Sequence, residues 1–173
     1  FKYCCKAGIP LQGITHDLSK FSPTEFIENV KYYNGKVFPI VKCKEENGLS
    51  YAWLHHKGRN KHHYEYWQDN FDLGGQSLRM PFKYALEQIC DYLAAGKSYN
   101  GKDFTYQQEY KWWINKCKQP IAMHPQTKEF TNLMLKTLAE TDSLQCLKKD
   151  KAHQIYLQAA EKTHTTLPVK NSL

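Results

Sequence analysis

Apolar residues recur at spacings of three and four along most of this chain, and no segment alternates polar and apolar residues as a half-buried strand does. The clearest helix start is at Ser22, where Pro23 suits the first turn and Glu25 stands where it can close a capping box. Pro81 and Pro125 open further helical stretches. The 173 residues, 41% of them apolar, suit one compact core. We therefore predict an all-α, single-domain helical bundle.

One helical domain is expected to cover residues 1–162, followed by a flexible tail over residues 163–173. Residues 36–48 and 70–79 are expected to be loops. The first residues read as the end of a helix that stops at Gly8, so we expect a further helix upstream of Phe1.

A net charge of +7 favours anionic partners such as small nucleotide-like or other phosphorylated compounds, although a basic surface can also serve solubility alone. Nucleic acid is a less favoured partner, because the densest basic run, Lys148-Lys149-Asp150-Lys151, is short and interrupted. No apolar run has transmembrane length, so no membrane partner is expected.

Six cysteines are scattered along the chain without a CxxC pair, which argues against a zinc ribbon or a thioredoxin motif. We expect reduced thiols in a cytoplasmic protein, although an even number of cysteines also permits disulfides. Cys90 falls within an apolar helical pattern and is expected in the core.

Four of the eight histidines form two doublets within residues 55–63. If residues 50–69 were helical throughout, two faces would result, one with His56, Asn60 and His63 and the other with His55, Arg59 and His62. Imidazoles on one face can bind a metal ion together, and Arg59 beside them can hold a phosphate through two hydrogen bonds. The alternative is a surface helix that is merely rich in histidine. We expect His56 and His63 to face the site and His55 to be packed or solvated, unless Gly58 breaks the helix.

A second group of candidate ligands is the pair His16-Asp17, expected on a helix that Pro10 opens. Adjacent His and Asp can give a divalent metal one nitrogen and one oxygen ligand, and Lys20 one turn later can offset phosphate charge. The alternative is an ordinary helix end, where Lys20 favours the helix dipole. Asp91 stands alone in an apolar stretch, which suggests metal binding, an exposed position or a hydrogen bond to a tyrosine.

The order of these residues resembles the HD superfamily, with a His-Asp pair, later histidines and a lone Asp on a later helix. The stretch at residues 16–20, HDLSK, is similar to the HD-hydrophobic-x-Lys motif of many HD phosphohydrolases and phosphodiesterases. The histidine doublet at 62–63 followed by Asp91 is similar to the binuclear branch that includes the HD-GYP phosphodiesterases, although the GYP motif is absent. The chain also resembles a small uncharacterised HD-like family that shares the motifs HDLSKFSPxEF and AWLHHxxRNKHHxxYW.

This resemblance implies metal-dependent hydrolysis of a phosphoester on a nucleotide-like substrate. The implied ligands of one or two divalent ions (Mn, Fe, Mg, Zn or Ni) are His16, Asp17, His56, His62, His63 and Asp91. The expected catalytic residues are Lys20, Arg59 and Asn60. HD proteins usually take another histidine ligand from a helix before the His-Asp pair, and we expect that ligand upstream of Phe1. A non-catalytic nucleotide- or metal-binding module and a di-iron HD-type oxygenase are alternatives.

Overall fold

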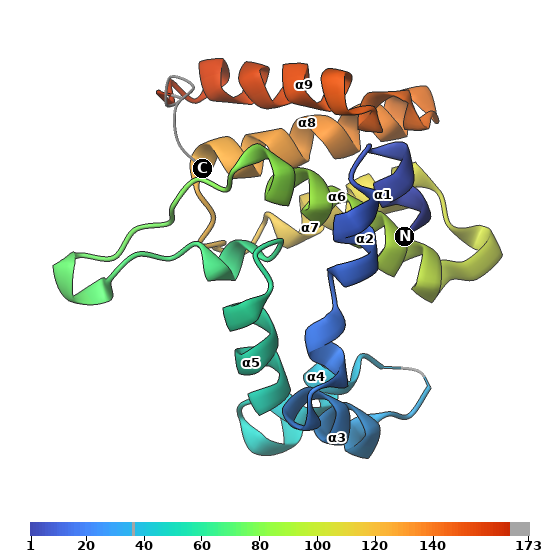
Figure 1. The fold of residues 1–173 in the computed structure, drawn as a ribbon, viewed down its shortest axis with the longest axis vertical. Coiled ribbons are helices and arrows are strands. Elements are labelled where there is room, and N and C mark those ends of the chain that lie inside the picture. The colour runs from blue at the N-terminus through green and yellow to red at the C-terminus, as the bar shows by residue number, and fades with distance from the viewer. Residues whose placement is uncertain (36, 167–173) are drawn as a thin grey trace.

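The computed structural model describes residues 1–35 and 37–166, and within these ranges it contains α-helices and short 3-10 helices (η) but no β-strand. Figure 1 shows two parts, a layered group of helices α6 to α9 and a smaller lobe of helices α3 to α5 that projects from it. Helices α1 and α2 lead from the first part to the second. The prediction of an all-α helical bundle is confirmed.

The N-terminal half contains α1 (Lys2–Lys6), α2 (Pro10–Thr15), η1 (Leu18–Phe21), α3 (Pro23–Tyr32), α4 (Pro39–Asn47), α5 (Tyr51–Arg59), η2 (Tyr64–Tyr66) and η3 (Phe71–Leu73). The C-terminal half contains α6 (Phe82–Asn100), η4 (Gly101–Asp103), α7 (Tyr106–Lys116), α8 (Pro125–Thr141), η5 (Leu144–Leu147) and α9 (Lys149–Lys162).

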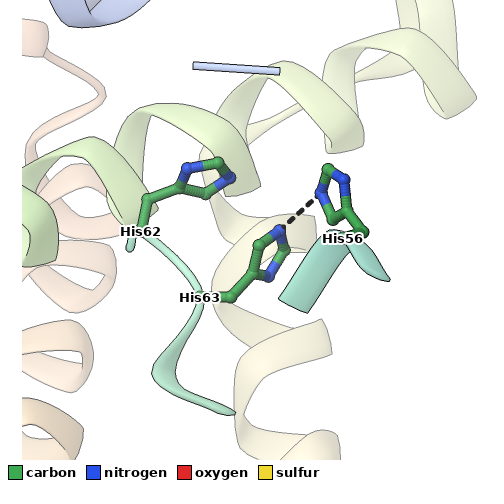
Figure 2. A group of neighbouring side chains, drawn as sticks. All are labelled: His56, His62 and His63. Atoms are coloured by element: carbon green, nitrogen blue, oxygen red, sulfur yellow. Dashed lines mark hydrogen bonds between the residues drawn. The ribbon is translucent and has the colours of Figure 1, made fainter. Parts of the chain in front are cut away.

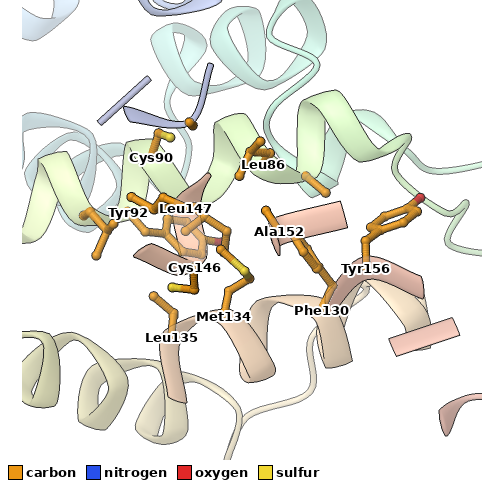
Figure 3. Close-up of a cluster of buried hydrophobic side chains, with 14 of the residues drawn as sticks. Leu86, Cys90, Tyr92, Phe130, Met134, Leu135, Cys146, Leu147, Ala152 and Tyr156 are labelled. Atoms are coloured by element: carbon orange, nitrogen blue, oxygen red, sulfur yellow. The ribbon is translucent and has the colours of Figure 1, made fainter. Parts of the chain in front are cut away.

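Helix α6 runs through the centre of the main core, between α1 and the layer formed by α8 and α9 (Figure 3). Leu86, Ile89 and Leu93 follow one another at helical spacing on α6 and are fully buried. They belong to the same buried cluster as Met134 of α8, and Cys90 is buried there as predicted. Each such aliphatic side chain contributes about 1.5–3 kcal/mol through burial, so this core fixes the position of α6.

The smaller lobe begins with the predicted N-cap, because the Ser22 hydroxyl accepts a hydrogen bond from the backbone N–H of Glu25. The Glu25 side chain does not close a capping box, and it is buried toward α5 instead. The apolar residues Phe26, Ile27 and Val30 lie on the exposed side of α3. Helix α3 therefore packs against α5 through a carboxylate rather than through its apolar stripe.

Two segments differ from their predicted structure. The sequence predicts a loop over residues 36–48, but Pro39 opens α4, which ends where Gly48 adopts a left-handed φ of 76°. The stretch at 61–69, which a continuous helix over residues 50–69 would include, is mostly turn and 3-10 helix, because α5 ends at Arg59 and Asn60 is extended. The Asn60 amide donates to the His56 carbonyl and satisfies this helix end, whereas Gly58 remains helical.

The predicted tail lies largely outside the described residues, which end at 166. Its first residues remain attached to α9, since the N–H groups of Thr163, His164 and Thr165 donate to carbonyls of that helix. Along the described chain, no helix combines the length and the apolar character needed to cross a membrane.

A buried carboxyl at the contact of α6 with α7 gives a test of this packing. Glu109 of α7 is only 6% exposed and lies against Gly96 of α6, where an added Cβ would collide with the Glu109 carboxyl group. Burial, and to a smaller extent the charge of Asp91, raises the pKa of Glu109 from 4.5 to about 7. The folded chain therefore binds more protons than the unfolded chain between these pH values.

We expect the protein to lose stability as the pH rises from about 4.5 to 7, because Glu109 must then ionise in a buried position. Glu109→Gln keeps the shape without the charge, so it should raise the free energy of unfolding by roughly 1–3 kcal/mol at pH 8 and have little effect at pH 4.5. Thermal unfolding of both proteins at the two pH values measures this. An identical pH dependence in the variant would contradict the assignment.

Candidate metal centre

Three residues from distant parts of the chain meet where α2 approaches the middle of α6. His16 Nε2 lies 3.3 Å from Asp17 Oδ2 and 3.4 Å from Asp91 Oδ1. Helix α2 ends at Thr15, so His16 and Asp17 occupy the connection to η1 rather than the helix in which they are expected. The structure thus brings these three side chains together, as their order in the sequence leads us to expect.

The second group of histidines stands beside the first. His56 comes from the last turn of α5, and His62 and His63 come from the turn that follows (Figure 2). His56 Nε2 and His63 Nε2 are 3.0 Å apart, and the rings of His62 and His63 are 4.4 Å apart between centroids. Because the chain turns at Asn60, His62 joins His56 and His63 rather than the face of His55 on which a continuous helix would place it.

Asp17 stands between the two groups. Its Oδ1 lies 3.5 Å from His56 Nε2 and 3.7 Å from His62 Nε2, and its Oδ2 faces His16. Ligand atoms of His56, His62 and His63 lie within 4.8 Å of one another, as do those of His16, His62 and Asp91. The arrangement therefore offers two adjoining sets of ligands, with His62 common to both and the Asp17 carboxylate between them.

Two atoms of this centre are buried without a hydrogen-bond partner among the described residues, namely Asp17 Oδ1 and His62 Nε2. A buried polar atom left unpaired costs roughly 1–3 kcal/mol. The two atoms face each other at a separation too long for a hydrogen bond. A cation between them would satisfy both, so the residues present fit a divalent metal ion.

The protonation of His63 and of Asp17 suits a metal ion, whereas, despite its burial, nearby carboxylates raise the pKa of His62. Burial, followed by the charges of His62 and His56, lowers the pKa of His63 to about 2, so its imidazole is neutral and able to act as a ligand. Burial opposes ionisation of Asp17, but Lys20 and the nearby histidines outweigh it and keep its pKa below the usual value. Neutral imidazoles and carboxylates are ligands for Zn, Mn, Fe and Ni.

Two buried glutamates face the Nδ1 atoms of the histidine rings, on the side away from the centre. Glu25, 1% exposed, accepts from His55 Nδ1 at 2.6 Å and from His56 Nδ1 at 2.8 Å. Burial alone would raise the pKa of Glu25, but hydrogen bonds from His55, Ser19 and His56 lower it below the usual value. Glu87 Oε1 stands 3.5 Å from His62 Nδ1, and its Oε2 accepts from Gln12. Both glutamates leave Nε2 of the metal-facing rings directed at the centre.

The three residues expected to be catalytic occupy different places. Lys20 forms an ion pair with Asp17 and lies at the edge of the centre. Asn60 is 8% exposed and donates to Ser19 and to the His56 carbonyl, so it positions the loop and the His56 ring. The Arg59 side chain is turned away, toward His55 Nε2 at 2.7 Å. Of the three, only Lys20 combines an exposed charge with a contact to a candidate ligand, namely Asp17.

Glu25 and Glu87 are absent from the site residues that the sequence suggests. The sequence contains a signal that could have identified Glu87, because this residue precedes Asp91 by four positions and therefore shares its side of α6. Glu25 has a competing explanation as a capping residue, and only the packing of α3 against α5 reveals its contacts with His55 and His56.

The two histidine doublets allow a matched comparison. We expect His56→Ala and His63→Ala to lower the metal content of the purified protein by at least about half, because each removes a nitrogen from the ligand group. His55→Ala should reduce it less, since His55 contacts Glu25 and Arg59 and is not among those ligands. Elemental analysis of the three variants measures the difference. A larger loss of metal in His55→Ala than in the other two variants would show that His55, rather than His56 or His63, binds the metal.

Glu25 gives a second test that leaves every candidate ligand in place. Glu25→Gln should weaken zinc affinity about 10–100-fold, because the His56 ring loses a charged acceptor at Nδ1. Competition with a chromogenic chelator measures the affinity. Glu46→Gln, on the exposed side of α4, is the control and should bind zinc as the unchanged protein does. Equal affinities for the two variants would exclude this role of Glu25.

Comparison with known proteins identifies the family to which this chain belongs. A search of the curated proteins and a search of the solved structures each found no match. A family model described as a family of unknown function (DUF5662) matches residues 1–137. This range contains both groups of candidate ligands and the two glutamates behind them. Because the match covers well over half of the 173 residues, the chain belongs to the DUF5662 family.

Proposed function

We propose that this protein is a metal-dependent phosphohydrolase that acts on a nucleotide-like phosphoester. The observation that carries the proposal is the pair of buried, unpartnered atoms Asp17 Oδ1 and His62 Nε2, which face each other among four imidazoles. A cluster of this kind is costly for a purely structural role, because unpaired polar atoms destabilise the folded state. The similarity of the His-Asp motif to HD proteins supports the same reaction class.

The proposal includes two adjoining ion sites, which the placement of the ligands supports. His16, Asp17 and Asp91 would hold one ion, and His56 and His63 would hold the other with the second Asp17 oxygen. His62 lies within reach of both groups. The chemistry that such ions supply is the acidification of a water molecule and the polarisation of a phosphoryl oxygen.

The protein's own groups would prepare the site for that chemistry. Glu25 and Glu87 fix the rings of His56 and His62, so the site needs little reorganisation when a substrate binds. The Lys20 ammonium lies beside Asp17 and is half-exposed, so it can reach a phosphate oxygen and neutralise charge that develops there. The net charge of +7 attracts an anionic substrate toward this site.

A cytoplasmic location is part of the proposal. All six cysteines of the chain, each within the described residues, are free. Free thiols are compatible with a reducing compartment.

The test combines metal analysis with a panel of phosphoesters. Protein purified in air and loaded separately with manganese, zinc, nickel or iron should release phosphate from nucleoside monophosphates, and a chelator should abolish the release. Lys20→Ala should lower kcat about 10–100-fold, because one positive charge is lost from the transition state. Lys136→Ala, on the surface of α8, is the matched control and should leave kcat unchanged.

Bound metal without phosphate release from any member of the panel would reject hydrolysis and leave a binding module. Oxygen consumption by the iron-loaded protein, without phosphate release, would instead point to oxygenase chemistry. Loss of activity in Lys20→Ala should be partly restored by Lys20→Arg, which keeps the charge. Equal kcat values for Lys20→Ala, Lys20→Arg and the unchanged protein would exclude a role of Lys20 in the reaction.

A further inference from the structure

One face of α6 continues from the metal centre to the open surface. Asp91, Ala95 and Tyr99 stand at intervals of four residues and therefore share a side of the helix. The opposite side of α6 is buried in the core, where Ile89 and Leu93 are fully enclosed. Ala95 is exposed and small, so it leaves the helix surface uncovered between Asp91 and Tyr99.

Tyr99 lies at the outer end of this face, about 12 Å along the helix from Asp91 at roughly 1.5 Å per residue. Helical side chains tilt toward the N-terminus of their helix, so the Tyr99 side chain leaves α6 in the direction of Asp91. It is 62% exposed, which is high for an aromatic ring beside a folded lobe. On this face of α6, the exposed Ala95 thus lies between Asp91 of the candidate centre and an exposed aromatic ring.

A second ring meets Tyr99 from the other part of the molecule. Phe38, directly before α4, contacts Tyr99 edge to face, with ring centroids 6.5 Å apart and planes at 90°. Phe38 is 40% exposed, so the pair keeps open ring surface. The contact joins the start of α4, in the α3–α5 lobe, to the end of α6.

Lys20 connects this pair to the metal centre. Burial raises the pKa of the Tyr99 hydroxyl, while the nearby Lys20 ammonium acts to lower it. The same ammonium is paired with Asp17. Lys20 therefore lies near both Asp17 and Tyr99, and its charge can hold a phosphate whose attached group extends toward Tyr99.

We propose that Tyr99 and Phe38 form a ring-binding subsite, which takes the base of a nucleotide whose phosphate lies at Lys20 and the metal centre. The proposal rests on the proposed function for the position of the phosphate. Aromatic side chains bind bases of any sequence through their faces. The distance along α6 is of the order of the length of a nucleotide, so a sugar can separate the two ends.

The experiment measures equilibrium binding rather than turnover. The probes are the non-hydrolysable phosphonate analogues of adenosine monophosphate and of ribose 5-phosphate, which differ by the base, titrated calorimetrically into the metal-loaded chain. We expect the analogue with the base to bind about 10-fold more tightly, within the range that stacking on one aromatic ring provides. Tyr99→Ala should abolish this preference, and Tyr99→Phe should retain it.

Tyr51→Ala is the matched control and should keep the preference, because Tyr51 is 66% exposed on α5 and lies outside the face of α6. Equal binding of the two analogues to the unchanged protein, or no binding of either, would overturn the subsite. A preference for the base that survives Tyr99→Ala would overturn it as well. Base-dependent binding without phosphate release would support the subsite and reject hydrolysis, whereas phosphate release without a preference for the base would do the reverse.

Discussion

The buried carboxylate of Glu25 supports one of the two groups of candidate ligands in the centre. It accepts hydrogen bonds from His55 and His56, and thereby attaches α3 to the end of α5. Because the carboxylate is only 1% exposed, removal of its partners would leave a buried charge unpaired, which is strongly destabilising. The orientation of His56, and with it the position of the following turn, depends on this contact.

The turn after α5 depends in the same way on Asn60. Its amide donates to the His56 carbonyl and to the Ser19 hydroxyl, so the end of α5 is tied to the segment that carries Asp17. The chain then leaves the helix direction and returns His62 and His63 to the side of His56. A local hydrogen bond at a helix end therefore decides which imidazoles come together.

The core and the candidate centre use opposite sides of α6, one apolar and one acidic. Leu86, Ile89 and Leu93 hold one side of this helix in an apolar cluster, while Glu87 and Asp91 present carboxylates on the other side. The apolar side fixes the helix rigidly, and a rigid helix can hold charged groups at short distances from one another. This explains how a centre with two unpaired buried atoms is maintained in a folded chain.

The sequence by itself determined the helical class, the starts of α3, α6 and α8, and the residue types of the centre, because capping residues and helical spacing are local signals. Only the tertiary structure decided where α5 ends, that residues 39–47 are helical, and that Glu25 faces inward while Phe26 faces out. These outcomes depend on contacts between residues distant in the chain. Helical periodicity shows that a helix has two faces, but the partner that packs against it selects the buried one.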